Sequence, residues 1–194
     1  LYISSDHDKK QSQDEIDTDV GLRAKSHSQF FPPSPYQGPF WQLLFAHPVK
    51  AVKNIVALCN HAAERYRDST LQNEIIELTV PFLPEGRRFL FSERMWLTYR
   101  GTTVTPYMLQ SALMALEKWL LEAHTVGVDI APCLEYVLRK STSAFTLSVV
   151  ASVLNAYPRL CSEKFLDLFR VREFIGMDRI RMVHESHAHA MASP

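Results

Sequence analysis

Hydrophobic residues recur at helical spacing along most of this chain, and the clearest case is the stretch from Thr105 to His124. Apolar residues form two adjacent stripes there, an arc much wider than a surface helix needs, so we expect a central helix packed on several sides. Thr105 is the expected N-cap, and Pro106 fits the first helical position, where a missing N–H costs nothing. Polar residues interrupt the arc only at Gln110, Ser111, Glu117, Lys118 and Glu122.

The same spacing predicts further helices on both sides of this one. Residues 141–157 are apolar on nearly all sides, with Ser141 or Thr142 as the cap, and Pro158 ends that helix. Pro106, Pro132 and Pro158 are evenly spaced, which suggests helical hairpins, although the residues between them do not repeat. The predicted helices cover 40–45, 48–69, 92–97, 105–124, 129–140, 141–157, 164–170 and 178–191.

One segment has a different period. From Asn73 onward apolar and polar residues alternate, Pro84-Glu85-Gly86 supplies turn chemistry, and an extended run from Arg87 to Phe91 follows. This pattern predicts a β-hairpin within about 73–91 that projects from a helical chain. The expected fold is therefore mostly all-α, with antiparallel helical hairpins in a HEAT- or TPR-like bundle and one inserted β-hairpin.

Two parts of the amino-terminal region differ in kind. Residues 1–29 are polar and charged, so we expect a flexible arm or linker before a helical domain over 30–190. Residues 30–39 combine two phenylalanines, four prolines and Tyr36, which predicts a stiff extended strap across a helical surface. The strap is also a possible ligand for a proline-recognising module, and Tyr36 is a candidate interaction residue.

Composition limits the possible partners. Twenty-one basic residues balance twenty-one acidic ones, so the chain has no general attraction for nucleic acid or an anionic membrane. No apolar run approaches the ~18 residues of a membrane span, and no signal-peptide pattern opens the sequence. We expect a cytoplasmic protein whose three cysteines are reduced core residues. The chain opens with Leu1 rather than an initiator Met. An excised piece of a longer protein would begin in this way, and so would a processed protein.

Candidate catalytic residues are few. The helix from Pro48 places Asn60 beside an apolar stripe, where its amide must find partners, and the adjacent His61 has no identifiable catalytic companion. We expect this pair to brace the helix against a loop. The inward stripe of the same helix is predicted at Val49, Val52, Val56, Cys59, Ala63 and Tyr66.

Metal and nucleotide chemistry lack their usual motifs. His184 and His187 would share a helical face, but His189 would not join them, and no acidic or cysteine partner has zinc-motif spacing. The chain has no G-x-x-x-x-G-K-[ST], G-x-S-x-G, C-x-x-C or H-E-x-x-H pattern. We therefore expect no cofactor, no metal and no catalytic residue.

Arginines offer the remaining candidate contacts. Arg87 and Arg88 follow the predicted hairpin turn, and Arg100 lies in the turn before the central helix, beside Gly101 and several hydroxyls. Each of these arginines could contact a phosphate. Arg87 and Arg88 would equally be explained as solvated residues of a hairpin tip. Arg100 would equally be explained as part of a structural turn, paired with a carboxylate or a carbonyl.

A family resemblance adds to this interpretation. The segments FPPSPYQGP (31–39), LTYRGT (97–102) and MALEK (114–118), in this order and spacing, resemble a helical region of very large bacterial ATP-binding proteins. Those are P-loop, STAND-like NTPases of the kind found in anti-phage defence systems. The resemblance runs from about Phe31 to about Glu185, and its motifs are structural. The family's phosphate-binding motif has no counterpart here, so no nucleotide or nuclease residue is carried over.

Three functional interpretations follow. The resemblance implies a non-enzymatic helical scaffold or sensor module of a large NTPase, acting on other domains of the parent protein or on a protein ligand. The alternative is a nucleic-acid-binding module that uses the hairpin arginines, Arg94 and the Tyr99–Thr103 turn. A small metal-dependent hydrolase, using His61 or the carboxy-terminal histidines, has no supporting spacing.

Overall fold

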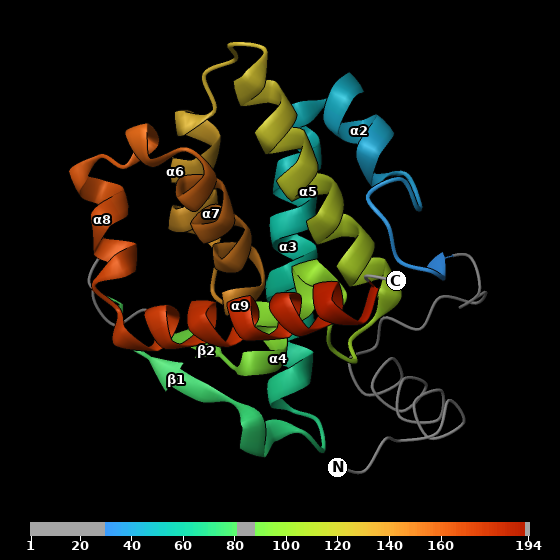
Figure 1. The fold of residues 1–194 in the computed structure, drawn as a ribbon, viewed down its shortest axis with the longest axis vertical. Helices are drawn as coiled ribbons and strands as arrows, with labels where there is room; N and C mark the ends of the chain where they lie inside the picture. Colours follow the sequence, from blue (N-terminus) through green and yellow to red (C-terminus); the bar gives the residue numbers. More distant parts are fainter. Residues whose placement is uncertain (1–29, 81–87, 193–194) are drawn as a thin grey trace.

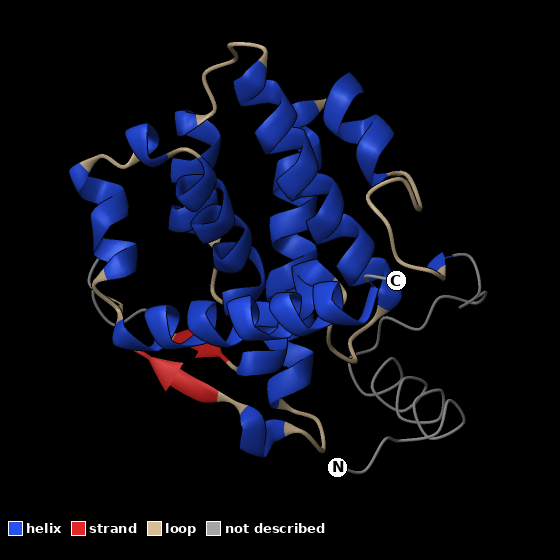
Figure 2. Cartoon of the chain, viewed as in Figure 1, coloured by secondary structure: helices blue, strands red, loops and turns tan. Residues whose placement is uncertain are grey.

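The computed structural model describes residues 30–80 and 88–192, without the side chains of Lys164 and 187–192. These ranges contain eight α-helices and a single two-stranded antiparallel sheet (Figure 2). The predicted class, mostly α with one inserted β-hairpin, is therefore confirmed. The expected arm at 1–29 and the turn at 84–86 lie outside the described residues.

Three helices form the centre of the molecule: α3 (Pro48–Arg67), α5 (Tyr107–Thr125) and α7 (Ala144–Ala156). Every residue of α7 from Ala144 to Leu154 is buried, as expected for a helix that is apolar on all sides. α2 packs against α3 and α5, α6 packs against α3 and α7, and α9 runs crosswise to these helices (Figure 1). The remaining elements are α2 (Phe40–Ala46), η2 (Gln72–Glu74), α4 (Glu93–Leu97), η3 (Thr98–Arg100), α6 (Ala131–Lys140), η4 (Pro158–Leu160), α8 (Glu163–Phe169) and α9 (Arg172–Ala192).

Several helix starts differ from the predictions, including that of α6, which begins at Ala131 rather than at residue 129. α5 begins at Tyr107, because Pro106 has an extended ψ of 125° and occupies the N-cap position itself. α7 begins after Ser143, because the Ser141 hydroxyl instead donates to the Val137 carbonyl at the end of α6. α9 begins at Arg172 rather than at Asp178, so Gly176 lies inside the helix.

The sheet pairs β1 (Ile76–Leu78) with β2 (Phe89–Phe91), in the register Ile76↔Phe91, Glu77↔Leu90 and Leu78↔Phe89. The prediction that the hairpin projects from the domain is wrong for β2, whose three residues are all buried. The Leu90 N–H donates to the Thr142 carbonyl at 2.8 Å, so β2 is held between β1 and the loop before α7. Apolar side chains on both faces of β2 explain this burial.

Asn60 braces α3 against that same loop, as predicted. Its side-chain nitrogen donates to the Lys140 carbonyl at 2.8 Å, and its side-chain oxygen accepts the Thr142 N–H at 2.9 Å. His61 is exposed. The expected inward stripe of α3 is confirmed except at Val49, which is exposed because the buried face is centred on Ile55, Cys59, Ala62 and Tyr66.

Membrane-spanning helices were also not expected from the sequence. Within 30–80 and 88–192, none of the helices combines the length and the apolar character needed to cross a membrane.

Candidate interaction surface

The proline-rich strap packs on the first half of α5, as its composition predicted. The Phe31 ring contacts the Tyr107 ring with centroids 5.2 Å apart, and the Ser34 N–H donates to the Ser111 hydroxyl at 3.4 Å. These contacts fix both the start and the middle of the strap to one helix.

Glycine is required at the end of the strap. Gly38 has a φ of +74°, and a Cβ atom there would lie 2.6 Å from the Phe30 ring. The Gln37 N–H donates to the Ser34 carbonyl at 3.1 Å, which closes a turn just before Gly38. The strap therefore turns sharply into α2, and Tyr36 is presented beside that helix.

Tyr36, Trp41 and Phe45 form a continuous row of rings, which we call the aromatic face. Tyr36 meets Trp41 edge to face with centroids 5.3 Å apart, and Trp41 meets Phe45 at 4.9 Å. Trp41 and Phe45 are four residues apart and so share one side of α2, and Leu44, on the adjacent side that faces the core, is completely buried. Tyr36 is 57% exposed and Phe45 is 59% exposed.

Lys118 on α5 lies against two of the three rings. Its ammonium nitrogen lies 5.7 Å from the centroids of both the Tyr36 and the Trp41 ring, within cation–π range. The same nitrogen forms an ion pair with Glu122 at 2.7 Å. The side-chain hydrogen bond to Glu122 raises the pKa of Lys118.

The aromatic face has the features of a binding surface. Tyr and Trp are enriched at interaction hot spots because they bury a large apolar area with few rotatable bonds. Phe31 of the strap and Leu43 of α2 are exposed as well, although neither contacts the row in a ring pair. Scattered single apolar residues need no explanation, but a contiguous cluster on a rigid helix indicates a contact site.

The predicted interaction residues do not come together. Tyr36 belongs to the aromatic face, whereas Arg88 directly precedes β2, highly exposed and 3.5 Å from Glu77. Arg87 is outside the described residues. Arg94, a member of the alternative nucleic-acid set, holds Glu74 through two contacts of 2.7 and 2.8 Å. Arg88 and Arg94 thus already have carboxylate partners, which does not favour a phosphate-binding surface.

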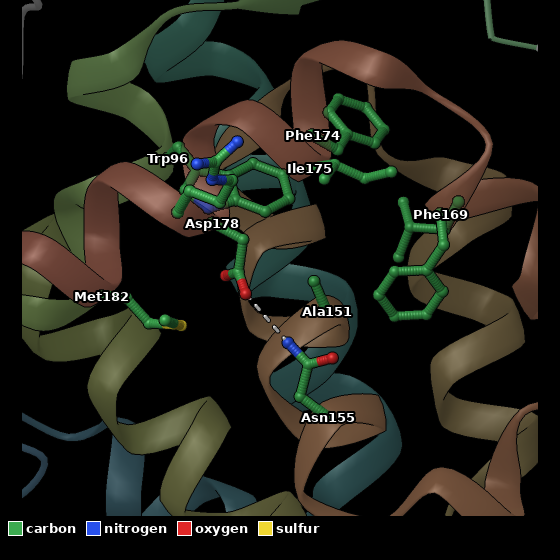
Figure 3. Close-up of a pocket in the computed structure, with 10 residues that line it drawn as sticks. Trp96, Ala151, Asn155, Phe169, Phe174, Ile175, Asp178 and Met182 are labelled. Atoms are coloured by element: carbon green, nitrogen blue, oxygen red, sulfur yellow. Dashed lines mark hydrogen bonds between the residues drawn. The ribbon is translucent and has the colours of Figure 1, made fainter.

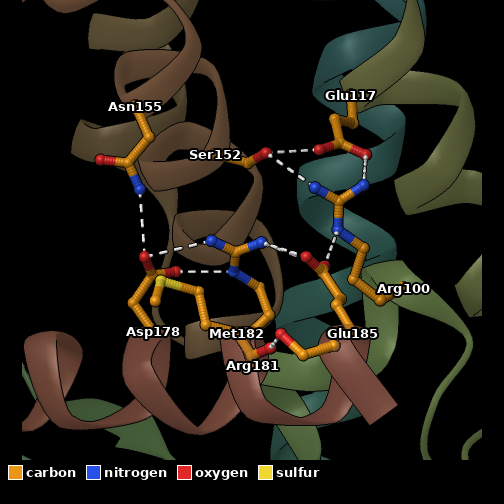
Figure 4. Close-up of polar contacts among 9 residues, drawn as sticks. Arg100, Glu117, Ser152, Asn155, Asp178, Arg181, Met182 and Glu185 are labelled. Atoms are coloured by element: carbon orange, nitrogen blue, oxygen red, sulfur yellow. Dashed lines mark hydrogen bonds and ion pairs between the residues drawn. The ribbon is translucent and has the colours of Figure 1, made fainter. Parts of the chain in front are cut away.

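Arg100 is also paired internally, with carboxylates of two helices (Figure 4). Its guanidinium contacts Glu117 of α5 at 3.2 Å and Glu185 of α9 at 2.8 Å, and it lies 4.7 Å from the Tyr99 ring centroid. Glu117 also accepts a short hydrogen bond from Ser152 of α7. Burial raises the pKa of Glu117, and the Arg100 charge opposes that shift. The cluster therefore joins three helices and the turn before α5.

Arg181 extends this cluster along α9. It contacts Asp178 at 2.8 Å and Glu185 at 2.8 Å, and Asp178 accepts a further hydrogen bond from Asn155 of α7 at 3.1 Å. Hydrogen bonding to Asp178 raises the pKa of the Arg181 guanidinium above its ordinary value. All of these groups find partners within the molecule, so the cluster fixes α9 to the bundle.

The part of the chain that the structure describes contains no cluster of candidate metal ligands. No group of three or more His, Cys, Asp or Glu side chains there could hold a metal ion. His184 is exposed, and the side chains of His187 and His189 lie outside the described residues.

The three cysteines are free thiols; the prediction that they are core residues is confirmed for Cys59, whereas Cys133 and Cys161 are half-buried. Burial raises the pKa of Cys59, and it raises the pKa of Cys133 to about 12, so neither is an activated nucleophile.

Sequence reasoning missed Trp41 and Phe45, because an apolar hexapeptide suggests burial on all sides. It also missed Lys118, because the contact of this side chain with the rings depends on how the strap and α2 lie on α5. Comparison with protein-family models and with curated proteins gives no match for this chain.

Proposed function

We propose that this chain is a non-enzymatic helical scaffold and sensor module that acts through protein–protein or interdomain contacts, with the aromatic face as its contact surface. The observation that carries this proposal is the row of Tyr36, Trp41 and Phe45, in which Tyr36 and Phe45 are exposed and Trp41, half-buried between them, packs on the core. Such a row gains more by burial against a partner than by exposure to water.

The arrangement beneath the row favours a preformed surface. The strap is fixed to α5 by Phe31 and Ser34, and Lys118 sits against two of the three rings. A partner that covers the rings would therefore pay little additional conformational entropy on this side of the interface. A complementary partner surface would be apolar, with a carbonyl or carboxylate placed to meet the Tyr36 hydroxyl or the Lys118 ammonium.

The parent protein is the second part of the proposal. The resemblance of residues 31–39, 97–102 and 114–118 to the helical region of STAND-like NTPases suggests a cytoplasmic bacterial protein of anti-phage defence type. In such a protein the partner would be another domain of the same polypeptide. A phosphate-binding P-loop motif upstream in the same reading frame would support this origin, and a complete reading frame of 194 residues would exclude it.

Photo-cross-linking tests the contact surface in the full-length protein. A benzophenone amino acid at Phe45 replaces one exposed aromatic side chain with another, and the same amino acid at Leu166, an exposed residue of α8, is the matched control. We expect position 45 to cross-link to one defined segment of another domain or of a bound protein. No product from position 45, or the same products from both positions, would contradict the proposed surface.

A further inference from the structure

A pocket of about 160 Å³ lies between α7, α8 and α9, on elements that do not contribute to the aromatic face (Figure 3). Its walls are mostly apolar and include Trp96, Phe169, Phe174 and Met182. The exposure of Ile175 and Met182 at its edge shows that it opens to solvent.

The aromatic wall of this pocket is rigid. Phe174 stacks on Trp96 with centroids 5.2 Å apart and also contacts Phe89 and Phe91 of β2. Asn155 and Asp178 are hydrogen-bonded across another side, from α7 to α9. Rings held from two sides in this way give a pocket that is already formed before a ligand arrives.

The volume limits the ligand to about one ring. An engineered protein cavity of roughly 150 Å³ with an apolar lining binds benzene. A pocket of about 160 Å³ with a similar lining therefore fits a single six-membered ring or a short branched aliphatic chain.

The polar groups at the mouth select the sign of the ligand's charge. Arg179 lines the pocket, is exposed, and has no hydrogen-bond or ion-pair partner among the described residues. Asp178, the acidic lining residue, is already neutralised by Arg181 at 2.8 Å. The guanidinium of Arg179 is thus the charge left for a ligand, and guanidinium pairs best with carboxylate.

We propose that this pocket binds a small amphiphilic carboxylate, with its apolar ring or chain against Phe174 and Trp96 and its carboxylate on Arg179. This site goes beyond the proposed contact surface and does not depend on it. A ligand that contacts Arg179 and Phe174 of α9 and the buried Trp96 of α4 would add a bridge between α9 and the core, so binding of a small molecule would stabilise the position of α9.

Isothermal titration of the full chain tests the proposal with three probes of one shape: phenylacetate, the neutral phenylacetamide and the cationic benzylamine. We expect saturable millimolar or tighter binding of phenylacetate, about fivefold tighter than phenylacetamide, and the weakest binding for benzylamine. Arg179→Gln should remove the preference for the anion, whereas Arg172→Gln, an exposed change on the same helix outside the pocket, should retain it.

The place of binding needs its own readout. Methyl NMR of the methionines should show the Met182 signal shifting with phenylacetate, and Met182→Trp, which narrows the mouth, should weaken binding in a chain that still melts cooperatively. No saturable binding at millimolar concentrations, equal affinity for the anion and the amide, or an anion preference that survives Arg179→Gln would each overturn the proposal.

Discussion

Arg100 and Glu185 form an ion pair, with 2.8 Å between Nε and Oε1, that joins the turn before α5 to α9. Arg181 holds the same carboxylate from within α9 at 2.8 Å. Each of these groups is partly exposed, and a single exposed ion pair contributes little to stability. The cluster acts instead as a connected set, in which Asp178 and Glu117 pair with the two guanidinium groups.

Removal of Arg181 should loosen α9 selectively. Arg181→Met leaves Asp178 and Glu185 without their shared partner, so we expect faster amide hydrogen exchange along α9 and a loss of about 1–3 kcal/mol in the free energy of unfolding. Arg179→Met, an exposed change two residues earlier on the same helix, is the control, and it should lower the free energy of unfolding by less than about 0.5 kcal/mol. Equal exchange rates for the two variants would show that the ion pairs do not hold α9.

Asn60 should be important for stability although it has no catalytic role. Asn60→Ala removes the two hydrogen bonds to Lys140 and Thr142, so we expect a loss of about 1–3 kcal/mol, measured by urea unfolding. The neighbouring exposed His61→Ala should change the free energy by less than about 0.5 kcal/mol. Similar midpoints for both variants would mean that the loop before α7 does not depend on this bracing.

Glu74 gives a prediction about acid stability. Hydrogen bonding to Arg94 holds the pKa of Glu74 below its ordinary value, and the Tyr66 hydroxyl also donates to it. A lowered folded-state pKa contributes stability that is present above the unfolded-state pKa and is lost as the pH falls through the folded-state value. Glu74→Gln should therefore flatten the dependence of unfolding free energy on pH below about pH 4.

Tyr66→Phe provides the comparison for that experiment. It removes the phenol hydrogen bond but keeps Arg94, the larger cause of the shift, so it should retain more of the acid dependence than Glu74→Gln does. If the curve of Glu74→Gln matches that of the wild-type chain, the Glu74–Arg94 contact does not persist in solution.

The fold class, the order of the helices and the burial of α7 could be predicted from the sequence, because helical spacing and proline positions are local signals. The predicted first residues of the helices were less accurate. Pro106 replaced Thr105 at the cap of α5, and Asp178 lies inside α9, so a residue that suits a helix end does not by itself mark one.

Features that depend on distant residues could not be predicted. Glu117 interrupts an apolar arc in the sequence, and its burial is possible because Arg100 and Ser152 come from other elements to meet it. The aromatic face was predicted only at Tyr36. Whether Trp41 and Phe45 point inward or outward depends on how α2 sits on α5, and a seven-residue helix carries little periodicity from which to decide.

The chain alone should neither bind nor hydrolyse ATP. A nucleotide site needs several backbone N–H groups around the phosphates and a free basic side chain, whereas Arg100 is paired with two glutamates and Pro106 offers no N–H at the start of α5. Isothermal titration with ATP and Mg²⁺ and a phosphate-release assay check this expectation. Micromolar binding that disappears in Arg100→Ala would make the Tyr99–Thr103 turn a nucleotide site.

The most direct test of the proposed function is the affinity for the segment or protein that cross-links to position 45. Tyr36→Ala and Phe45→Ala remove exposed rings, and Val49→Ala removes an exposed apolar side chain outside the row. We predict that each ring substitution raises the dissociation constant by about tenfold or more, and that Val49→Ala leaves it within about twofold. An unchanged dissociation constant for both ring variants, with circular dichroism showing an intact fold, would contradict the assignment of the aromatic face as the contact surface.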